Sequence, residues 1–376
     1  MRSGGSRSSL AARSALHRHR ERRNVLRSLA AMGIGVAVAP FMPRAARSSG
    51  HPLYFTWAGY DIPELFPAYV EEHGAPPEFA VYGDAEEGLQ KLRGGYVVDV
   101  AHPSSTDVPR WRDAGLLQPI DVTRLSHWPD LFPALTTLEG TQTDGQQWFV
   151  PFDWGQTSIT YRTDILGIDP YEESWGILWD ERWSNRIGVL DSAAEAWWAA
   201  AAYAGVDPRN VDEADHARVA ELLRQQRPLV RQYTTDTSSL EQGLASGELV
   251  AAMTWNSSAS RLIADGMPVR FADPKEGSLV WSTGLVLHAE APNPDRAYEA
   301  IDAMLAPEAG EYVLREVGFG HSNRKTFERF SADELAAIGQ PADPLQALDR
   351  SVFLVPQSAA FQERINREFE EITAGF

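Results

Sequence analysis

Two tryptophans that stand beside small hydroxyl-bearing residues are the side chains best suited to bind a ligand. Trp255 ends an apolar run and is followed by Asn256, Ser257 and Ser258, and Trp281 stands in the similar run 278–283. Aromatic faces attract cations and support sugar rings, while hydroxyls fix the orientation of a ligand. We therefore expect two strands that form two walls of one pocket for a small cationic or sugar-like solute.

Motifs for catalysis or for cofactor binding do not accompany these tryptophans. The chain has no His-Glu-x-x-His helix, no phosphate-binding loop, no Gly-x-Gly-x-x-Gly pattern and no Gly-x-Ser-x-Gly elbow. It also has no cysteine, which excludes disulfides, thiol nucleophiles and cysteine-ligated metals. We expect no cofactor, no metal and no enzymatic activity.

Charge divides the chain into a basic start and an acidic remainder. The net charge is −18, yet residues 1–50 hold ten arginines and one acidic residue, so the rest carries a net charge of −27. An acidic body disfavours nucleic acid and anionic membranes as partners. It also keeps a protein soluble, and its long-range field would favour cationic solutes.

Residues 1–50 are typical of an export signal. Arg22 and Arg23 precede an apolar run at 29–41, which at about 13 residues is too short to span a bilayer. The pattern resembles a twin-arginine signal, with ordinary Sec export as the alternative. We expect the mature chain to begin at 48–51 and to be soluble and periplasmic. A lipid anchor is not expected, since that anchor needs a cysteine.

Strand-like and helix-like segments alternate after the signal. This order predicts a mainly parallel sheet with helices on both faces. Asp84 and Glu87 predict a capping box for the second helix. The predicted elements are strands at 53–57, 78–82, 97–101, 158–161, 187–190, 249–254 and 280–288, and helices at 63–73, 85–93, 193–203, 212–225, 239–246, 294–305 and 359–372.

A break near residues 148–155 indicates a crossing from one lobe to another. We predict a first lobe from 51–154 plus 283–345 and a second lobe from 155–282. Residues 346–376 form a C-terminal helical segment that we expect to pack near the hinge.

Several short stretches in a shared order carry a family resemblance. They include Phe55-Thr56-Trp57-Ala58-Gly59-Tyr60, Asp99-Val100-Ala101-His102-Pro103-Ser104, Val150-Pro151-Phe152-Asp153-Trp154-Gly155 and Met253-Thr254-Trp255-Asn256-Ser257-Ser258-Ala259. From residue 53 almost to its end, the chain resembles the periplasmic substrate-binding proteins of spermidine/putrescine-type ABC importers. The resemblance implies a two-lobed α/β fold of type II, with a ligand cleft between lobes that close about a hinge. It also implies a monomer whose partners are a small organic amine or cation and an ABC permease of the inner membrane.

The resemblance transfers the ligand contacts unevenly. Two positions where the family places amine-binding carboxylates hold Ser192 and Thr283 here, and Phe319 stands at a tyrosine position. Only Glu195 matches a carboxylate. The other matching positions are Trp57, Tyr60, Ser104, Trp255, Trp281 and Gln357.

The missing carboxylates restrict the ligand, because a protonated amine that leaves water needs a counter-charge. Either the ligand is a monocation or zwitterion seated on Glu195, or another acid such as Asp153 or Asp191 replaces the lost ones. Asp153 is added to the candidate ligand contacts on this ground. Its alternative roles are a solvated hinge acid and a helix cap.

These observations favour a periplasmic solute-binding protein that captures a polyamine or a related organic cation. The alternative is a binder of a γ-aminobutyrate-like zwitterion or an aminophosphonate, whose anionic end would meet Arg261, Arg270 or Arg324. An exported carbohydrate-active enzyme with Asp153 and Glu195 as paired acids ranks last.

Overall fold

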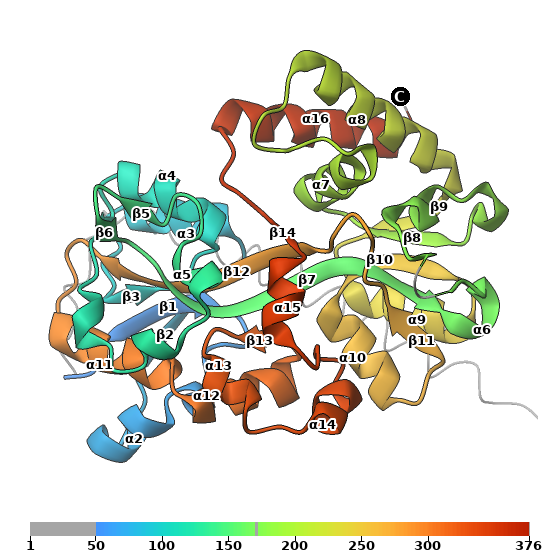
Figure 1. Ribbon diagram of the computed structural model, residues 1–376. Coiled ribbons are helices and arrows are strands. Elements are labelled where there is room, and N and C mark those ends of the chain that lie inside the picture. Colours follow the sequence, from blue (N-terminus) through green and yellow to red (C-terminus); the bar gives the residue numbers. More distant parts are fainter. Residues whose placement is uncertain (1–49, 170–171, 376) are drawn as a thin grey trace, which may run out of the picture. The chain divides into compact units, whose positions relative to one another are not determined.

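The computed structural model describes residues 50–169 and 172–375 (Figure 1). The predicted export signal, including Arg22 and Arg23, lies outside these residues apart from Gly50. Within the described part, no helix combines the length and apolar character that crossing a membrane requires.

Most of the strands form one twelve-stranded sheet whose central order is β2-β1-β3-β12-β7-β10-β8-β9. The strands are β1 (Leu53–Trp57), β2 (Glu78–Tyr82), β3 (Val100–Ala101), β4 (Leu117–Gln118), β5 (Gln142–Thr143), β6 (Gln146–Gln147), β7 (Val150–Arg162), β8 (Ile187–Leu190), β9 (Val230–Thr234), β10 (Ala251–Trp255), β11 (Val269–Phe271), β12 (Leu279–His288), β13 (Gly320–His321) and β14 (Val352–Phe353).

The α-helices cover this sheet, and short 3₁₀ turns connect several elements. The helices are α2 (Pro67–His73), α3 (Ala85–Arg93), α4 (Val108–Asp113), α5 (Pro133–Thr136), α6 (Thr163–Leu166), α7 (Ala193–Ala204), α8 (Glu213–Gln226), α9 (Thr237–Ser246), α10 (Asn256–Ala264), α11 (Pro294–Met304), α12 (Pro307–Tyr312), α13 (Arg324–Phe327), α14 (Ala332–Ala337), α15 (Pro344–Asp349) and α16 (Ala359–Ala374). A π-helical turn, Val313–Val317, follows α12.

The sheet consists of two parallel parts joined by two long antiparallel strands. Strands β1, β2 and β3 pair in parallel, as do β8, β9 and β10. Between them β7 and β12 run antiparallel and side by side (Figure 1). The predicted parallel arrangement therefore holds for the outer strands. The predicted break before 158 is wrong, because β7 is one continuous strand of 13 residues.

Separate hydrophobic cores pack on the two halves of these long strands. Val150 and Phe152 of β7 pack in a core with residues of β1, β3 and α11. Ile159 and Tyr161 of the same strand pack in another core with β8, α7 and β10. Residues of one strand thus belong to both cores, as expected where a strand passes between the two lobes of an α/β fold. The exact lobe limits proposed from the sequence stay a prediction.

The predicted capping box of α3 forms only in part. The carboxylate of Asp84 accepts the Glu87 backbone N–H at 2.8 Å, as expected for a cap. The Glu87 carboxylate accepts the N–H of Gly83 at 2.6 Å and not that of Asp84. Glu87 therefore accepts the backbone N–H of the residue before the N-cap, and not that of the N-cap itself as the motif predicts.

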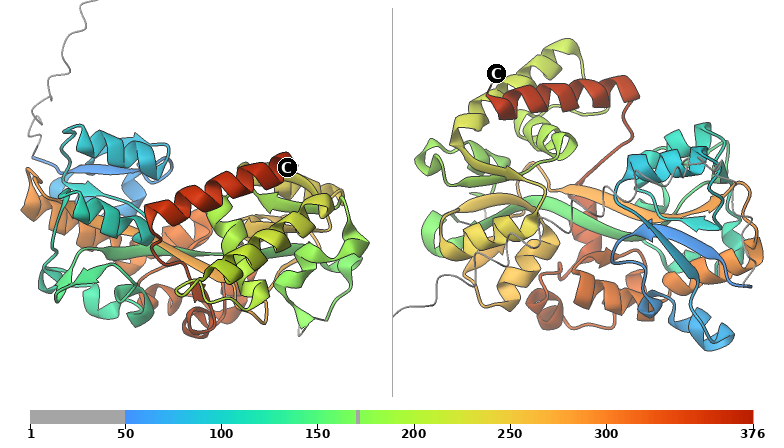
Figure 2. Two further views of the ribbon diagram at one scale, coloured as in Figure 1. Left: turned by 90° about the horizontal axis from the view of Figure 1, so that it is seen from above. Right: turned by 180° about the vertical axis from the view of Figure 1, so that it is seen from behind.

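The C-terminal segment divides between two places. Strand β14 pairs with β12, beside the long central strands, whereas α16 lies along α7 and α8 (Figure 2). The buried face of α16, formed by Ile365, Phe369 and Ile372, belongs to the core of β8 and β10. His216 of α8 and Glu368 of α16 add a contact of 2.7 Å between Nε2 and Oε2. Helix α16 therefore packs on the core of β8 and β10, and the predicted position of the segment near the hinge stays a prediction.

Replacing Phe369 with alanine tests whether α16 belongs to this core. The ring packs edge-on to Tyr233 at 5.7 Å and is almost fully buried, so Phe369→Ala should lower the free energy of unfolding by about 3 kcal/mol. Asn366→Ala, on the exposed face of the same helix, should change it by less than about 0.5 kcal/mol. Denaturant unfolding measures both, and equal stabilities for the two variants would contradict this packing.

Candidate functional site

The register of β7 and β12 places the candidate residues on one face of the strand pair. Asp153 is opposite Thr283, and Gly155 is opposite Trp281. Residues opposite each other in an antiparallel pair share a face, and every second residue returns to it. Asp153, Gly155 and Thr157 of β7 therefore share a face with Trp281 and Thr283 of β12.

Four residues form a hydrogen-bonded network at one end of this face, which we call the Asp153 network: Tyr60, His102, Asp153 and Thr283. The hydroxyls of Tyr60 and Thr283 both donate to the Asp153 carboxylate. Nε2 of His102 lies 2.8 Å from the Thr283 hydroxyl oxygen. The network joins the loop after β1, the loop after β3 and the two central strands.

The bonding pattern fixes the proton on His102. Because Thr283 donates its only proton to Asp153, it must accept from Nε2–H of His102. Nδ1 then carries no proton, and its single lone pair is shared by the hydroxyls of Tyr54 and Thr56, at 2.7 and 3.0 Å. Burial lowers the pKa of His102 to about 3, so this imidazole is neutral at neutral pH.

Asp153 is a buried carboxylate without a cationic partner. It is 0% exposed, and among the described residues its side chain is bonded to hydroxyls and not to Lys or Arg. Burial raises its pKa to about 6, although the hydrogen bonds from Thr283 and Tyr60 oppose that shift. The carboxylate is fully covered, whereas Tyr60 is partly exposed.

A second group, the Trp255 cluster, contains Glu195, Trp255, Trp281 and Phe319. Glu195 Oε1 accepts from the Thr157 hydroxyl at 2.5 Å and from the Trp255 indole N–H at 2.9 Å. Within the described part of the chain, Oε2 receives no hydrogen bond and is not among the fully buried atoms without a partner. The carboxylate is thus held by one oxygen and keeps the other for a further donor.

The rings of the cluster meet edge to face. Trp281 lies 6.3 Å from Trp255 and 4.7 Å from Phe319, with interplanar angles of 70° and 86°. The Trp281 ring lies over Gly155, where a Cβ atom would come within 2.1 Å of Cζ2. Only glycine leaves room for this indole. The arrangement provides aromatic surface beside the Glu195 carboxylate.

Asn256, which was not among the predicted ligand contacts, ties the Trp255 cluster to neighbouring elements by two hydrogen bonds of its side chain. Its side-chain oxygen accepts the Gln156 N–H at 3.0 Å, and its Nδ2 donates to the Gly318 carbonyl at 2.9 Å. It therefore links the central strand to the turn that carries Phe319. Its position directly after Trp255 is the only signal in the sequence.

The remaining candidates occupy separate places. Ser104 forms an isolated bridge with Thr283, so it borders the Asp153 network. Ser192 caps α7, and its hydroxyl accepts the Glu195 N–H at 3.4 Å. Trp57 packs on Tyr82 at 4.6 Å, outside both groups. Asp191, the other candidate acid, is exposed.

Gln357 lines a hollow of about 350 Å³ together with Thr106, Asp107 and Arg110. This hollow borders Ser104 through a 3.1 Å contact between the hydroxyls of Ser104 and Thr106. No hydrogen bond among the described residues joins Gln357 to the Trp255 cluster or the Asp153 network. It is therefore separate from the groups that hold the other candidates.

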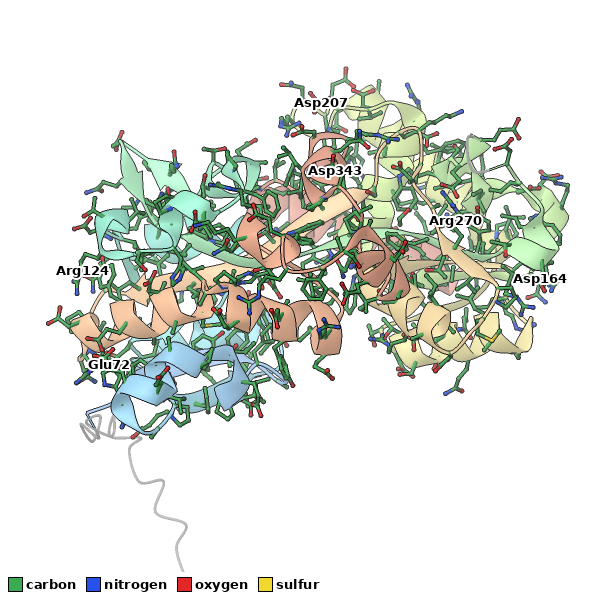
Figure 3. All side chains as sticks on the ribbon, turned by 60° about the horizontal axis from the view of Figure 1, so that its bottom comes forward. Glu72, Arg124, Asp164, Asp207, Arg270 and Asp343 are labelled. Atoms are coloured by element: carbon green, nitrogen blue, oxygen red, sulfur yellow. The ribbon has the colours of Figure 1, made fainter. Side chains whose placement is uncertain are left out.

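A further hollow, of about 240 Å³, lies on α2 and α11, where Glu72 and Arg124 line it. Figure 3 labels these two side chains at the periphery, away from the central strands. No group of three or more His, Asp or Glu side chains in the described residues is placed to hold a metal ion. The chemistry available on the central face is recognition by charge, aromatic rings and hydroxyls.

Comparison with known proteins decides the family. The model of a family described as bacterial extracellular solute-binding protein matches residues 71–332. The chain belongs to this family. As a solute-binding protein it is similar to the putrescine/agmatine-binding protein of Pseudomonas aeruginosa, with 30% identity over 74% of this chain and 80% of that protein. It is also 27% identical to the putrescine-binding periplasmic protein PotF of Escherichia coli, over 77% of this chain and 83% of that protein.

Solved structures support the same fold for this solute-binding protein. The spermidine/putrescine ABC transporter substrate-binding protein PotD of Streptococcus pneumoniae superimposes with a TM-score of 0.74 at 20% identity, covering 86% of this chain and 98% of that one. A structure described as the Atu4243 γ-aminobutyrate (GABA) receptor gives a TM-score of 0.68 at 16% identity, with coverage of 87% and 98%. These likenesses confirm the two-lobed α/β fold.

Gly155→Ala tests the placement of Trp281. The added methyl group would overlap the indole, so the ring must move, at a cost of about 1–3 kcal/mol in the free energy of unfolding. The indole N–H resonance of Trp281 should shift in an NMR spectrum of labelled protein. Gly83→Ala, whose methyl would meet only the flexible Glu87 side chain, should leave that resonance unchanged. An unshifted Trp281 signal in Gly155→Ala would contradict the packing.

Proposed function

We propose that this chain is the periplasmic solute receptor of an ABC importer and that it captures a polyamine or a related organic cation. The observation that carries the proposal is the free Oε2 of Glu195 beside the Trp255 and Trp281 rings. An ammonium group placed there gains a charge-assisted hydrogen bond and cation–π attraction. The names of the relatives support the same class of ligand.

Capture without chemistry follows from the same residues. A glycosidase needs two carboxyl groups that flank a scissile bond. Asp153 is fully buried and hydrogen-bonded to two hydroxyls, so its carboxyl group is not accessible to a sugar. We propose that closure of the lobes hides the ligand and presents the receptor to a permease in the inner membrane.

Export is part of the proposal, since a receptor of this kind works outside the cytoplasm. The arginine pair Arg22-Arg23 before the apolar run supports passage through the twin-arginine machinery. The acidic body supports a soluble periplasmic monomer that does not bind nucleic acid.

A zwitterionic ligand such as γ-aminobutyrate is the second candidate. One observation favours it: the buried indole Nε1 of Trp281 has no hydrogen-bond partner among the described residues and would suit a carboxylate. The arginines that were expected to bind the anionic end of such a ligand count against it, because each already pairs with an acidic side chain. Arg261 pairs with Glu241, Arg270 with Glu173, and Arg324 and Lys325 with Asp130.

A ligand screen separates these candidates. Thermal unfolding should be recorded with putrescine, spermidine, choline, betaine and γ-aminobutyrate at equal concentration. Stabilisation by putrescine, spermidine or choline alone supports the cation receptor, whereas stabilisation only by the zwitterions γ-aminobutyrate or betaine supports the second candidate. No stabilisation by any of them would contradict both.

Glu195→Gln and Trp255→Ala test the site itself. Glu195→Gln removes the counter-charge and should weaken binding of the best ligand about 10- to 100-fold, from about 1.5–3 kcal/mol for a charged hydrogen bond. Trp255→Ala removes an aromatic face and one of the donors that hold Glu195, so a loss of at least about tenfold is expected.

Titration calorimetry measures these affinities, and circular dichroism checks that each variant folds. Glu363→Gln, an exposed glutamate of α16, is the matched control and should bind as the wild type does. Unchanged affinity in both site variants would refute the site.

A further inference from the structure

Asp153 lies on the central strands, yet its position does not fit a direct ligand contact. Its carboxylate is fully buried, and both of its oxygens accept from hydroxyls, one of which belongs to the partly exposed Tyr60. A buried ionised carboxylate with only hydroxyl partners is costly, so its presence behind the proposed site needs a reason.

The hydroxyl of Tyr60 connects the buried carboxylate of Asp153 to a side chain that is partly exposed. Tyr60 donates its proton to Asp153, which leaves the lone pairs of its oxygen free to accept from a ligand. Thr283 also donates to Asp153, but its oxygen already accepts from His102. Tyr60 is therefore the member of the network that can pass the negative charge to a cation.

We propose that Asp153 is a specificity-determining residue that never touches the ligand and strengthens cation binding only while it is ionised, by polarising the Tyr60 hydroxyl. This inference rests on the proposed function. An ionised Asp153 holds the tyrosine proton, so the tyrosine oxygen presents an acceptor to an ammonium group. A protonated Asp153 instead has a proton of its own to donate, and the negative charge behind Tyr60 disappears.

The groups that face Asp153 leave its charge uncompensated at neutral pH. They are Tyr54 and Tyr60 from β1 and its loop, His102 after β3, and His321, which is opposite Asp153 on β13. Burial lowers the pKa of His102 to about 3 and that of His321 to about 4, so both are neutral. A bound cation would supply the missing positive charge.

The titration of Asp153 then gives the direction of the pH effect. With a folded-state pKa of about 6 against an ordinary value of 3.8, the unliganded fold binds the proton more tightly than the unfolded chain does. The unliganded protein is therefore stabilised as the pH falls through about 6. A cation needs the ionised form, so ligand affinity changes in the opposite sense and falls over the same range.

Putrescine, which stays doubly charged between pH 5 and 8, is the probe. Calorimetry should give about tenfold weaker binding at pH 5 than at pH 7.5, because about one tenth of Asp153 is ionised one unit below its pKa. At pH 6, binding should release up to about half a proton, which titration in two buffers of different ionisation enthalpy measures.

Asp153→Asn should bind at both pH values at least as weakly as the wild type does at pH 5, and it should release no proton. Tyr60→Phe should give the same flat profile, because the charge no longer reaches the ligand. Asp107→Asn is the matched control: burial raises the pKa of Asp107 to about 6 as well, but it lies in the hollow beside Gln357. It should keep the pH dependence of the wild type.

The outcomes are distinct. Absence of binding by any amine at pH 7.5 would overturn the proposed function. Binding that is equally tight at pH 5 and 7.5, or a pH dependence that persists in Asp153→Asn or vanishes in Asp107→Asn, would overturn this inference alone. If Asp153→Asn does not fold, Tyr60→Phe and the proton release of the wild type decide the question.

Discussion

The antiparallel pairing of β7 with β12 is the constraint on which the rest of the structure depends. These strands carry core residues of both lobes, and their register places Asp153 against Thr283 and Gly155 against Trp281. A shift of one residue would turn each of these side chains to the other face. The same hydrogen bonds that join the lobes therefore also assemble the candidate site.

Two carboxylates beside this strand pair are held by hydrogen bonds in different ways. In the Trp255 cluster, hydrogen bonds from Thr157 and Trp255 hold one oxygen of Glu195 and leave the other available. In the Asp153 network, each oxygen of the carboxylate accepts a hydrogen bond from a hydroxyl, one from Tyr60 and one from Thr283. Under the proposed function, Glu195 would contact the ligand directly and Asp153 would act on it indirectly. The two acids differ in their hydrogen bonds, since one oxygen of Glu195 and both oxygens of Asp153 have donors among the described residues.

The sequence predicted the elements that have a strong local pattern. The strands at 53–57, 78–82 and 187–190 are confirmed with the same limits, because short runs rich in apolar residues specify them. The continuity of β7 was missed, because Pro151 and Gly155 indicate a break that pairing with β12 overrides. Pairing is a tertiary effect, so it cannot be read from the strand alone.

The candidate site was predictable in its aromatic part and not in its hydrogen bonds. Trp255, Trp281 and Glu195 could be selected because their residue types suit a cation, and the structure brings them together. His102 and Thr157 could not, since a histidine and a threonine have many ordinary roles. Asp153 was selected as a contact, yet its hydrogen bonds come from a loop residue, Tyr60, and a strand residue, Thr283, that are both distant in the sequence.

The turn that carries Phe319 is held by its main chain. The carbonyl oxygen of Gly318 accepts from both Asn256 and Gln340, each at 2.9 Å, directly after a π-helical turn. Neither bond involves the side chain at position 319. The side chain at position 319 can therefore change without loss of the two hydrogen bonds that hold the turn.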